Sequence, residues 1–405
     1  MKIDYLSDRL LTGTQIETEL YNLDILYKWE NNCLSEPENN FVDFKNVELL
    51  GRGSFGQVFS VLFNKFDLAI KESKLTIKER NALKKNISYN SFPEEYKILY
   101  WIKTLIEENI CPNFIYTYGF SLCDNCKILT LGGLIKKNYC YLTFMEKAST
   151  ELSHANIVDY KHQLSILQQI LMGISSMQKY FSLSHDDIKK ENILLKKVSN
   201  LKGTYIQYFL DDKEYLIENP GWIVLISDFG VSRSFSPKYS LDGYFGERNA
   251  KIVSGQFKPI ISDSYLSKND KTKKFTRLKP YKFKWINSEG TKNRVYKGQK
   301  NNFDTPVDLF DTQKFPPFEF FNDVQDALRI FIGGKRLCQP DVHEPLNISS
   351  KLIKQIHQIL PEKMNKLYST NFKLDSTHLF LANKLVEKLY TKPKNGVTIS
   401  NTFYI

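Results

Sequence analysis

Three closely spaced glycines between two apolar runs restrict the fold of this 405-residue chain more than any other feature of its sequence. The segment "GRGSFGQV" has the pattern G-x-G-x-x-G-x-V, whose fixed positions are Gly51, Gly53, Gly56 and Val58. Dinucleotide-binding folds use the same glycine spacing, but there the glycines open a helix. Here they separate two strand-like runs, so we expect a β-hairpin. Such a hairpin, with Ser54 and Phe55 before its last glycine, can lie over a triphosphate with its N–H groups facing the oxygens.

A lysine and an acid follow at positions that suit the same phosphates. Lys71 ends the strand-like "LAIK", 15 residues after Gly56, and can reach phosphate oxygens beneath the hairpin. The helical period of residues 94–109 places Glu95 beside the face that packs on the sheet. We therefore expect an ion pair between Lys71 and Glu95, with Glu94 as the alternative. Taken singly, Glu95 also fits a solvated acid in the first turn of a helix.

A second polar group lies in "SLSHDDIKKENILLKK" (182–197), just before an apolar run. Two aspartates, a lysine and an asparagine stand there at fixed offsets, and "SDFG" follows at 227–230. Phosphoryl transfer needs positioning and neutralisation of several negative oxygens more than covalent help. Carboxylate and amide oxygens also suit Mg²⁺, a hard ion.

These motifs resemble those of eukaryotic-type serine/threonine protein kinases, whose catalytic loop reads H-R-D-L-K-x-x-N and whose metal-binding motif is D-F-G. The resemblance implies that Asp187 accepts or orients the proton of the substrate hydroxyl and that Lys189 stabilises charge on the transferred phosphoryl group. It also implies that Asn192 and Asp228 hold Mg²⁺. The expected reaction is ATP- and Mg²⁺-dependent phosphorylation of serine or threonine in protein substrates.

The same resemblance implies an adenine pocket made of apolar side chains and hinge backbone. Val58 and Ala69 would form its roof, and Leu194 its floor. In "YLTFMEKA", Met145 would be the gatekeeper, and the backbone of Glu146 to Ala148 would face adenine. Each apolar residue of this set also fits a simple core position.

The expected fold is α+β with two lobes. An extension (1–44) precedes a small lobe (45–147), an antiparallel sheet carrying one helix. A larger, mainly helical lobe (148–405) follows. It contains an insertion at about 198–222, predicted as a hairpin turning at "DDK", and a long activation region at about 231–315.

The sequence departs from the family pattern at several positions. Asp186 occupies the position where many family members keep an arginine that grips a phosphate on the activation loop. We therefore predict that activity does not depend on phosphorylation of that loop. The Asp, the insertion and "FIGGKRLCQPDVHEP" (331–345) together resemble kinases of large cytoplasmic DNA viruses. Asp323 matches the buried aspartate of a later family helix.

The positive charge of the chain is concentrated in one block. Residues 265–300 carry twelve Lys or Arg and two acids, which is +10 of a net +11. A local block of this kind suits a surface that meets an anionic partner. We favour acidic or already phosphorylated protein substrates. A solvated insertion, and contact with nucleic acid or a membrane surface, remain the alternatives.

Six cysteines in 405 residues are too few for a disulfide framework, so free thiols are expected. "CDNC" (123–126) is predicted as a hairpin turn, with a metal site as the less favoured interpretation. The sequence contains no apolar run long enough to span a membrane and no signal-peptide core at its start. We expect a cytoplasmic location, in the host cytoplasm or the virion if the viral resemblance holds.

Two other functions share part of these motifs. A catalytically silent pseudokinase scaffold would be expected to lack Lys71, Asp187, Asn192 or Asp228, and all four are present. A small-molecule kinase of the aminoglycoside type shares the His, Asp and Asn of the loop. The D-F-G motif and the glycine hairpin followed by "AIK" favour protein substrates over that rival.

Overall fold

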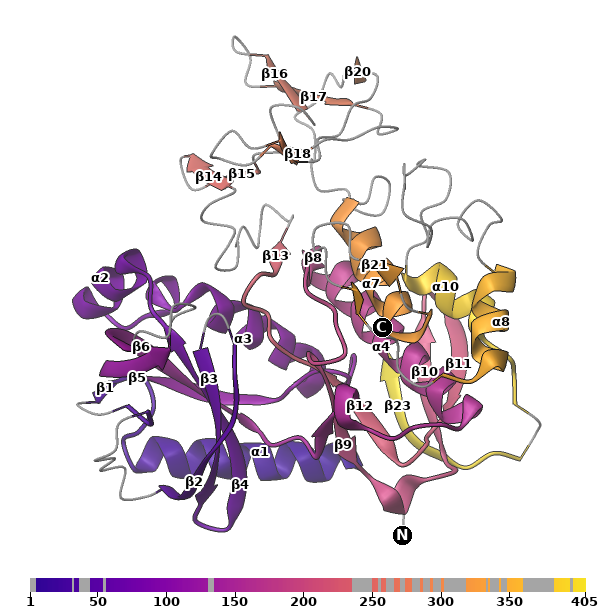
Figure 1. The fold of residues 1–405 in the computed structure, drawn as a ribbon, viewed down its shortest axis with the longest axis horizontal. Helices are drawn as coiled ribbons and strands as arrows, with labels where there is room; N and C mark the ends of the chain where they lie inside the picture. Colours follow the sequence, from indigo (N-terminus) through magenta and orange to yellow (C-terminus); the bar gives the residue numbers. More distant parts are fainter. Residues whose placement is uncertain are drawn as a thin grey trace.

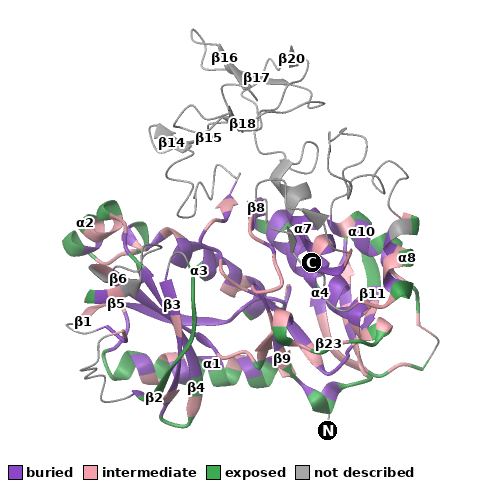
Figure 2. Cartoon of the chain, viewed as in Figure 1, coloured by how far each residue is buried: buried purple, intermediate pink, exposed green. Residues whose placement is uncertain are grey.

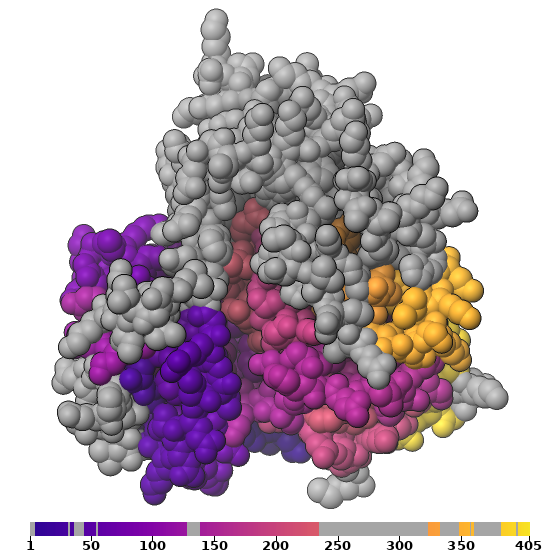
Figure 3. All heavy atoms as spheres, in the orientation of Figure 1, coloured from indigo at the N-terminus to yellow at the C-terminus, as the bar shows by residue number. Residues whose placement is uncertain are grey.

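The computed structural model describes residues 5–30, 33–35, 44–53, 56–129, 135–234, 318–332, 348–359, 382–393 and 396–405, together with the backbone of short strands between 250 and 343. The described part divides into a sheet-based N-terminal lobe and a larger C-terminal lobe, which lie side by side (Figure 1). The space-filling view shows the same division, with indigo and violet residues beside magenta and yellow ones (Figure 3). The predicted α+β two-lobed fold is confirmed.

A six-stranded sheet in the order β1-β5-β6-β4-β3-β2 forms the N-terminal lobe. Its strands are β1 (Trp29–Glu30), β2 (Phe44–Arg52), β3 (Gly56–Phe63), β4 (Phe66–Lys74), β5 (Thr117–Leu129) and β6 (Ile135–Glu146). The predicted glycine hairpin is confirmed, because β2 and β3 pair antiparallel with Gly51 opposite Val58. A Cβ at Gly56 would lie 2.2 Å from the carbonyl oxygen of Glu72, so only glycine permits this approach of β3 to β4.

Three helices accompany this sheet. They are α1 (Tyr5–Asn22), α2 (Ile77–Lys85) and α3 (Glu94–Glu107). Helix α3 is the predicted one, and its periodic apolar residues 98, 99, 102, 105 and 106 are all buried. Helix α2 begins at a capping box between Thr76 and Glu79. Helix α1 belongs to the N-terminal extension and runs along the lower edge of the sheet in Figure 1.

The C-terminal lobe is built around α4 (Tyr160–Phe181), most of which is buried (Figure 2). The other helices among the described residues of this lobe are α7 (Phe318–Ile332), α8 (Ser350–Ile359) and α10 (Ala382–Leu389). Single 3₁₀ turns lie at Tyr89–Ser91, Leu152–His154 and Ser199–Leu201. Small sheets join β12 (Trp222–Ile226), β9 (Ile193–Lys197) and β7 (Thr150–Glu151), and pair β8 (Leu183–Ser184) with β13 (Arg233–Ser234). These two sheets carry the loops that hold the polar motifs.

The predicted insertion hairpin is confirmed as β10 (Tyr205–Leu210) and β11 (Lys213–Glu218). Asp211 and Asp212 form its turn with φ of 50° and 61°, as a two-residue hairpin turn requires. The last strand of the chain, β23 (Ile399–Tyr404), adds to β10 in parallel. The sequence did not predict this strand, because its partner lies about half the chain away.

The activation region and the basic block 265–300 lie outside the described residues, apart from short backbone strands. These strands are β14 (Ala250–Val253), β15 (Gln256–Pro259), β16 (Leu266–Asn269), β17 (Lys274–Leu278), β18 (Trp285–Ile286), β19 (Lys292–Asn293) and β20 (Lys300–Asn301). Two more, β21 (Gly334–Lys335) and β22 (Val342–His343), follow α7.

The expectation of free thiols is wrong for four cysteines. Disulfides join Cys33 to Cys123 and Cys126 to Cys140, while Cys111 is free and buried. The expected turn at "CDNC" is also wrong, because β5 continues through it. A bulge at Asn125, which has φ of 68°, absorbs the extra residue. Among the described helices, none has the length and apolar character that a membrane crossing requires.

Candidate active site

Lys71 lies at the centre of a buried group of charges. Its Nζ is 2.5 Å from Oε1 of Glu95 on α3 and 2.6 Å from Oδ1 of Asp228, which follows β12. The structure thus pairs Lys71 with Glu95 and not with Glu94. The carboxylate of Glu94 instead lies 3.5 Å from Lys97, and burial raises the pKa of Glu94 to about 7.

The two carboxylates determine the charge of Lys71. Burial alone would lower the pKa of Lys71, but the negative charges of Asp228 and Glu95 raise it above its ordinary value. Burial would likewise raise the pKa of Asp228, yet Lys71 holds it below its ordinary value. Lys71 and Asp228 are therefore charged at neutral pH. The Asp228 side chain remains 37% exposed, so a further cation or ligand can approach it.

Asp187 is held by two donors from its own loop. Its Oδ2 accepts hydrogen bonds from Nζ of Lys189 at 2.6 Å and from Nδ2 of Asn192 at 2.9 Å. Asn192 also donates to the carbonyl of Asp187 at 2.9 Å, so the loop closes on itself. The Lys and Asn offsets of two and five residues are those that let both side chains reach one carboxylate oxygen.

His185 fixes the backbone before this loop. Its Nε2 lies 2.9 Å from the carbonyl of Ser227, and its Nδ1 accepts from the N–H of Asp187 at 3.3 Å. One neutral tautomer satisfies both contacts, and burial lowers the pKa of His185 accordingly. On the other side, Asp323 of α7 accepts the N–H groups of His185 and Asp186 at 2.8 and 2.9 Å. The match proposed for Asp323 from the sequence therefore corresponds to a buried side chain beneath the loop.

The "DFG" segment and the catalytic loop are joined through Ser227. Both its N–H and its hydroxyl donate to the carbonyl of Asn192 at 3.0 Å. Since Ile193 pairs with Ile226, Asn192 and Asp228 lie at matching ends of the neighbouring strands β9 and β12. Asn192 and Asp228 are 36 residues apart in sequence but lie close together in the fold. The inserted hairpin connects the end of β9 to the start of β12, which are the strand ends opposite these two residues.

Three of the residues expected around adenine lie on adjacent strands of the N-terminal sheet. Ala69 on β4 is the register partner of Met145 on β6, and both are buried. Val58 on β3 is paired with Lys71 and is half-buried. Leu194 on β9 and Ala148 after β6 are also half-buried. Ser54 and Phe55 lie outside the described residues.

Comparison with known proteins agrees with this geometry. A family model described as "Protein kinase domain" matches residues 44–249, which include the glycine hairpin, the catalytic loop and the D-F-G motif. The chain belongs to the protein kinase family.

The relatives of this kinase come from viruses. It is 35% identical to the "Probable serine/threonine-protein kinase 380R" of Invertebrate iridescent virus 6, over 89% of this chain and 70% of that protein. It is 29% identical to the "Putative serine/threonine-protein kinase 019R" of Frog virus 3, over 73% of this chain and 38% of that protein. The narrower resemblance to kinases of large DNA viruses is thus confirmed.

One residue of the kinase site that the sequence did not suggest is Arg233 on β13. Its Nε lies 2.5 Å from Oδ2 of Asp186, and both side chains are mostly buried. The hydroxyl of Ser184 also donates to Asp186. Arg233 follows the D-F-G motif by only three residues, so the reversed charge at position 186 was the available signal for an arginine partner nearby.

Two more supporting residues were missed. Tyr141 on β6 donates its hydroxyl to Oε2 of Glu95 at 2.7 Å, on the side away from Lys71. Arg9 of α1 forms a buried ion pair with Glu146 at the end of β6 and donates to the carbonyl of Pro112 at 2.8 Å. Neither has a local sequence signal, since each contact joins segments 46 or more residues apart.

Proposed function

We propose that this kinase transfers the γ-phosphate of ATP to serine or threonine hydroxyls of protein substrates. The observation that carries the proposal is the joint placement of two constellations. Lys71 bridges Glu95 and Asp228, which follows β12. Asp187 is held by Lys189 and Asn192, just before the neighbouring strand β9. An intact set of these side chains supports an active enzyme over a pseudokinase.

Each side chain has a role that follows from its chemistry. Lys71, oriented by Glu95, binds phosphate oxygens beneath the glycine hairpin. Asp187 orients the substrate hydroxyl and receives its proton. Lys189, already in contact with Asp187, neutralises charge on the transferred group. Its side chain is 30% exposed, so it can also contact an incoming phosphate.

Asn192 and Asp228 provide a donor set suited to Mg²⁺. Because Nδ2 of Asn192 is occupied by Asp187, the amide oxygen is the atom left to act as a ligand. A carboxylate and an amide oxygen are hard donors, which fit Mg²⁺ with its retained waters. The bound ion would neutralise the phosphates, and the two residues would hold it at the ends of β9 and β12.

The ion pair between Asp186 and Arg233 supports control without loop phosphorylation. In the family pattern, an arginine on the catalytic loop binds a phosphorylated residue of the activation region. Here the charges are reversed, and the activation region supplies its own arginine to the loop. Phosphatase treatment of the purified kinase should therefore leave its activity unchanged, and abolished activity would contradict this mode of control.

The relatives' names support serine/threonine specificity, and their viral origin supports a place in the host cytoplasm or the virion. The +10 block at 265–300 supports acidic or phosphorylated protein substrates, although it lies outside the described side chains. We therefore expect higher activity on casein than on a basic protein, with the difference reduced by salt.

A labelling experiment tests the proposal. The purified chain is incubated with γ-labelled ATP, Mg²⁺ and, separately, casein, a basic protein and small alcohols. We expect label on serine or threonine of protein substrate. Label on small alcohols alone would support the small-molecule kinase, and nucleotide binding without any transfer would support the pseudokinase.

A further inference from the structure

Four cysteines converge on one face of the N-terminal sheet, opposite the catalytic lysine. Cys123 and Cys126 lie on β5, Cys140 lies on β6, and Cys33 lies in the segment after β1. All four are completely buried. Their face is defined by Glu72 of β4, since consecutive residues of a strand point to opposite faces and Lys71 points to the active site.

The strand register explains the convergence. Cys123 and Cys140 are directly opposite each other in the β5–β6 pair. Without a bulge, Cys126 would point to the other face, because it is three residues after Cys123. The bulge at Asn125 shifts the register by one residue, so that Cys126 returns to the face of Cys123 and Cys140.

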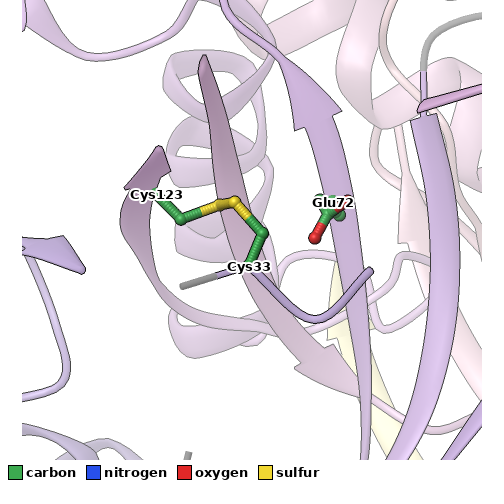
Figure 4. A group of neighbouring side chains, drawn as sticks. All are labelled: Cys33, Glu72 and Cys123. Atoms are coloured by element: carbon green, nitrogen blue, oxygen red, sulfur yellow. A yellow bond between two sulfur atoms is a disulfide. The ribbon is translucent and has the colours of Figure 1, made fainter. Parts of the chain in front are cut away.

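The side chain of Glu72 lies near both pairs of sulfurs. The sulfurs of Cys33 and Cys123 lie within 4.8 Å of a carboxylate oxygen of Glu72, as do those of Cys126 and Cys140. Figure 4 shows the first pair beside Glu72. Both disulfides thus lie beside one buried carboxylate. Moreover, Cys140 is directly opposite Cys123 in the β5–β6 pair, but the two disulfides join Cys140 to Cys126 and Cys123 to Cys33.

We propose that these four cysteines, when reduced, form a thiolate site for one Zn²⁺ ion. Four ligands including a C-x-x-C pair are the usual set of a structural zinc site, and thiolates select soft or borderline ions over Mg²⁺. Sulfurs bound to one zinc lie about 3.8 Å apart, given Zn–S bonds of about 2.3 Å in a tetrahedron. Within each pair, the Cα atoms lie 5.4 or 6.0 Å apart, and the register pairing of Cys123 with Cys140 brings the two pairs together.

The paired and metal-bound forms are the oxidised and reduced states of the same four sulfurs. Reduction of both disulfides takes four electrons and four protons, which two molecules of a dithiol reductant supply while each is oxidised to a disulfide. Binding of Zn²⁺ then releases the four thiol protons. In either state, Cys33 ties the N-terminal extension to β5, so the site fixes residues 33–35 against the lobe.

Glu72 is expected to lie beside this site without being a ligand. It already accepts hydrogen bonds from Nε2 of Gln57 at 2.9 Å and from the N–H of Ser35 at 3.2 Å. No lysine or arginine of the described residues forms an ion pair with it. Glu72→Gln keeps the size of the side chain and replaces the carboxylate by an amide, which makes it a diagnostic variant for a carboxylate ligand.

The test measures metal and thiols in the full-length protein purified with a reductant. We expect about one zinc per chain by elemental analysis, and four cysteines that resist alkylation until a chelator is added. Replacement of zinc by Co²⁺ should give the intense thiolate-to-cobalt absorption of a tetrahedral four-sulfur site. No bound metal, with either four reactive thiols or a mass showing two disulfides under reductant, would overturn the proposal.

Variants make the assignment specific. Cys126→Ser and Cys140→Ser should each lose the metal, whereas Cys111→Ser, which removes a buried cysteine outside the cluster, should keep it. Glu72→Gln should retain zinc as the wild type does. Loss of zinc in that variant would make Glu72 a ligand and contradict the four-cysteine site. Because the Co²⁺ spectrum is recorded on the wild type, variants that fail to fold do not decide the outcome.

Discussion

Glu95 is held from two sides, and this explains how a single carboxylate can orient Lys71. Its Oε1 meets Lys71, and its Oε2 accepts the hydroxyl of Tyr141. With both oxygens occupied, the carboxylate cannot rotate away from Lys71 without breaking a buried hydrogen bond. In the proposed function, in which Lys71 binds phosphate, the hydroxyl of Tyr141 acts indirectly, as a positioning group.

The substitution Tyr141→Phe should therefore weaken both stability and activity. Loss of a buried hydrogen bond to a charged group costs about 1.5–3 kcal/mol of the free energy of unfolding. We expect a higher KM for ATP as well, because Glu95 gains freedom. Tyr139→Phe is the matched control, since its hydroxyl makes no hydrogen bond among the described residues. Equal effects of the two variants, by denaturant titration and by steady-state kinetics, would contradict the role of Tyr141.

At the scale of elements, two short strands connect the catalytic loop to the activation region. Strands β8 and β13 pair through Ser184 and Arg233, and this places the guanidinium of Arg233 against Asp186. Asp186 has φ of 62°, and Asp323 of α7 accepts its N–H. The pair therefore links three elements without any added phosphate.

A charge swap tests this link. Asp186→Arg and Arg233→Asp each place like charges together, so each should lower kcat, on the order of tenfold for coupling of this size. The double variant restores an ion pair of opposite polarity and should recover most of the activity. Lys213→Glu, at the exposed pair with Glu387, is the control and should change little. A double variant whose loss equals the product of the two single losses would show that the residues act independently.

Sequence reasoning succeeded where a feature is local and failed where it depends on distant pairing. The glycine hairpin, the period of α3 and the turn at Asp211–Asp212 are each set by residues within a short window. Strand β23 and the contact of Arg9 with Glu146 join residues more than a hundred positions apart, so no window contains them. The turn predicted at "CDNC" failed for a related reason, because the partner strand turns a polar dipeptide into a bulge.

At the scale of the whole molecule, α1 contacts both the end of β6 and helix α3. Arg9 contacts Glu146 at the end of β6 and the carbonyl of Pro112. Further along the helix, Glu17 pairs with Lys103 of α3 at 2.6 Å. The extension thus connects the end of β6 to the helix that carries Glu95.

Removal of the Arg9 charge should destabilise the kinase strongly. Arg9→Met leaves Glu146 buried without its cation, which costs about 3–5 kcal/mol of the free energy of unfolding. Asp8→Ala, at the exposed neighbouring position, is the control and should cost less than about 0.5 kcal/mol. The double variant Arg9→Met with Glu146→Gln should recover part of the loss. An Arg9→Met protein as stable as the wild type in denaturant titration would show that the contact of α1 with the end of β6 does not stabilise the kinase.

The central claim is that Asp187 serves phosphoryl transfer while Lys71 and its partners bind the nucleotide. The most direct test compares wild type and Asp187→Asn for the rate of transfer to a protein substrate and for the affinity for ATP. General base catalysis contributes roughly 10²–10⁴-fold, so we expect kcat to fall by that range with ATP affinity nearly unchanged. Transfer by Asp187→Asn at the wild-type rate would contradict the account.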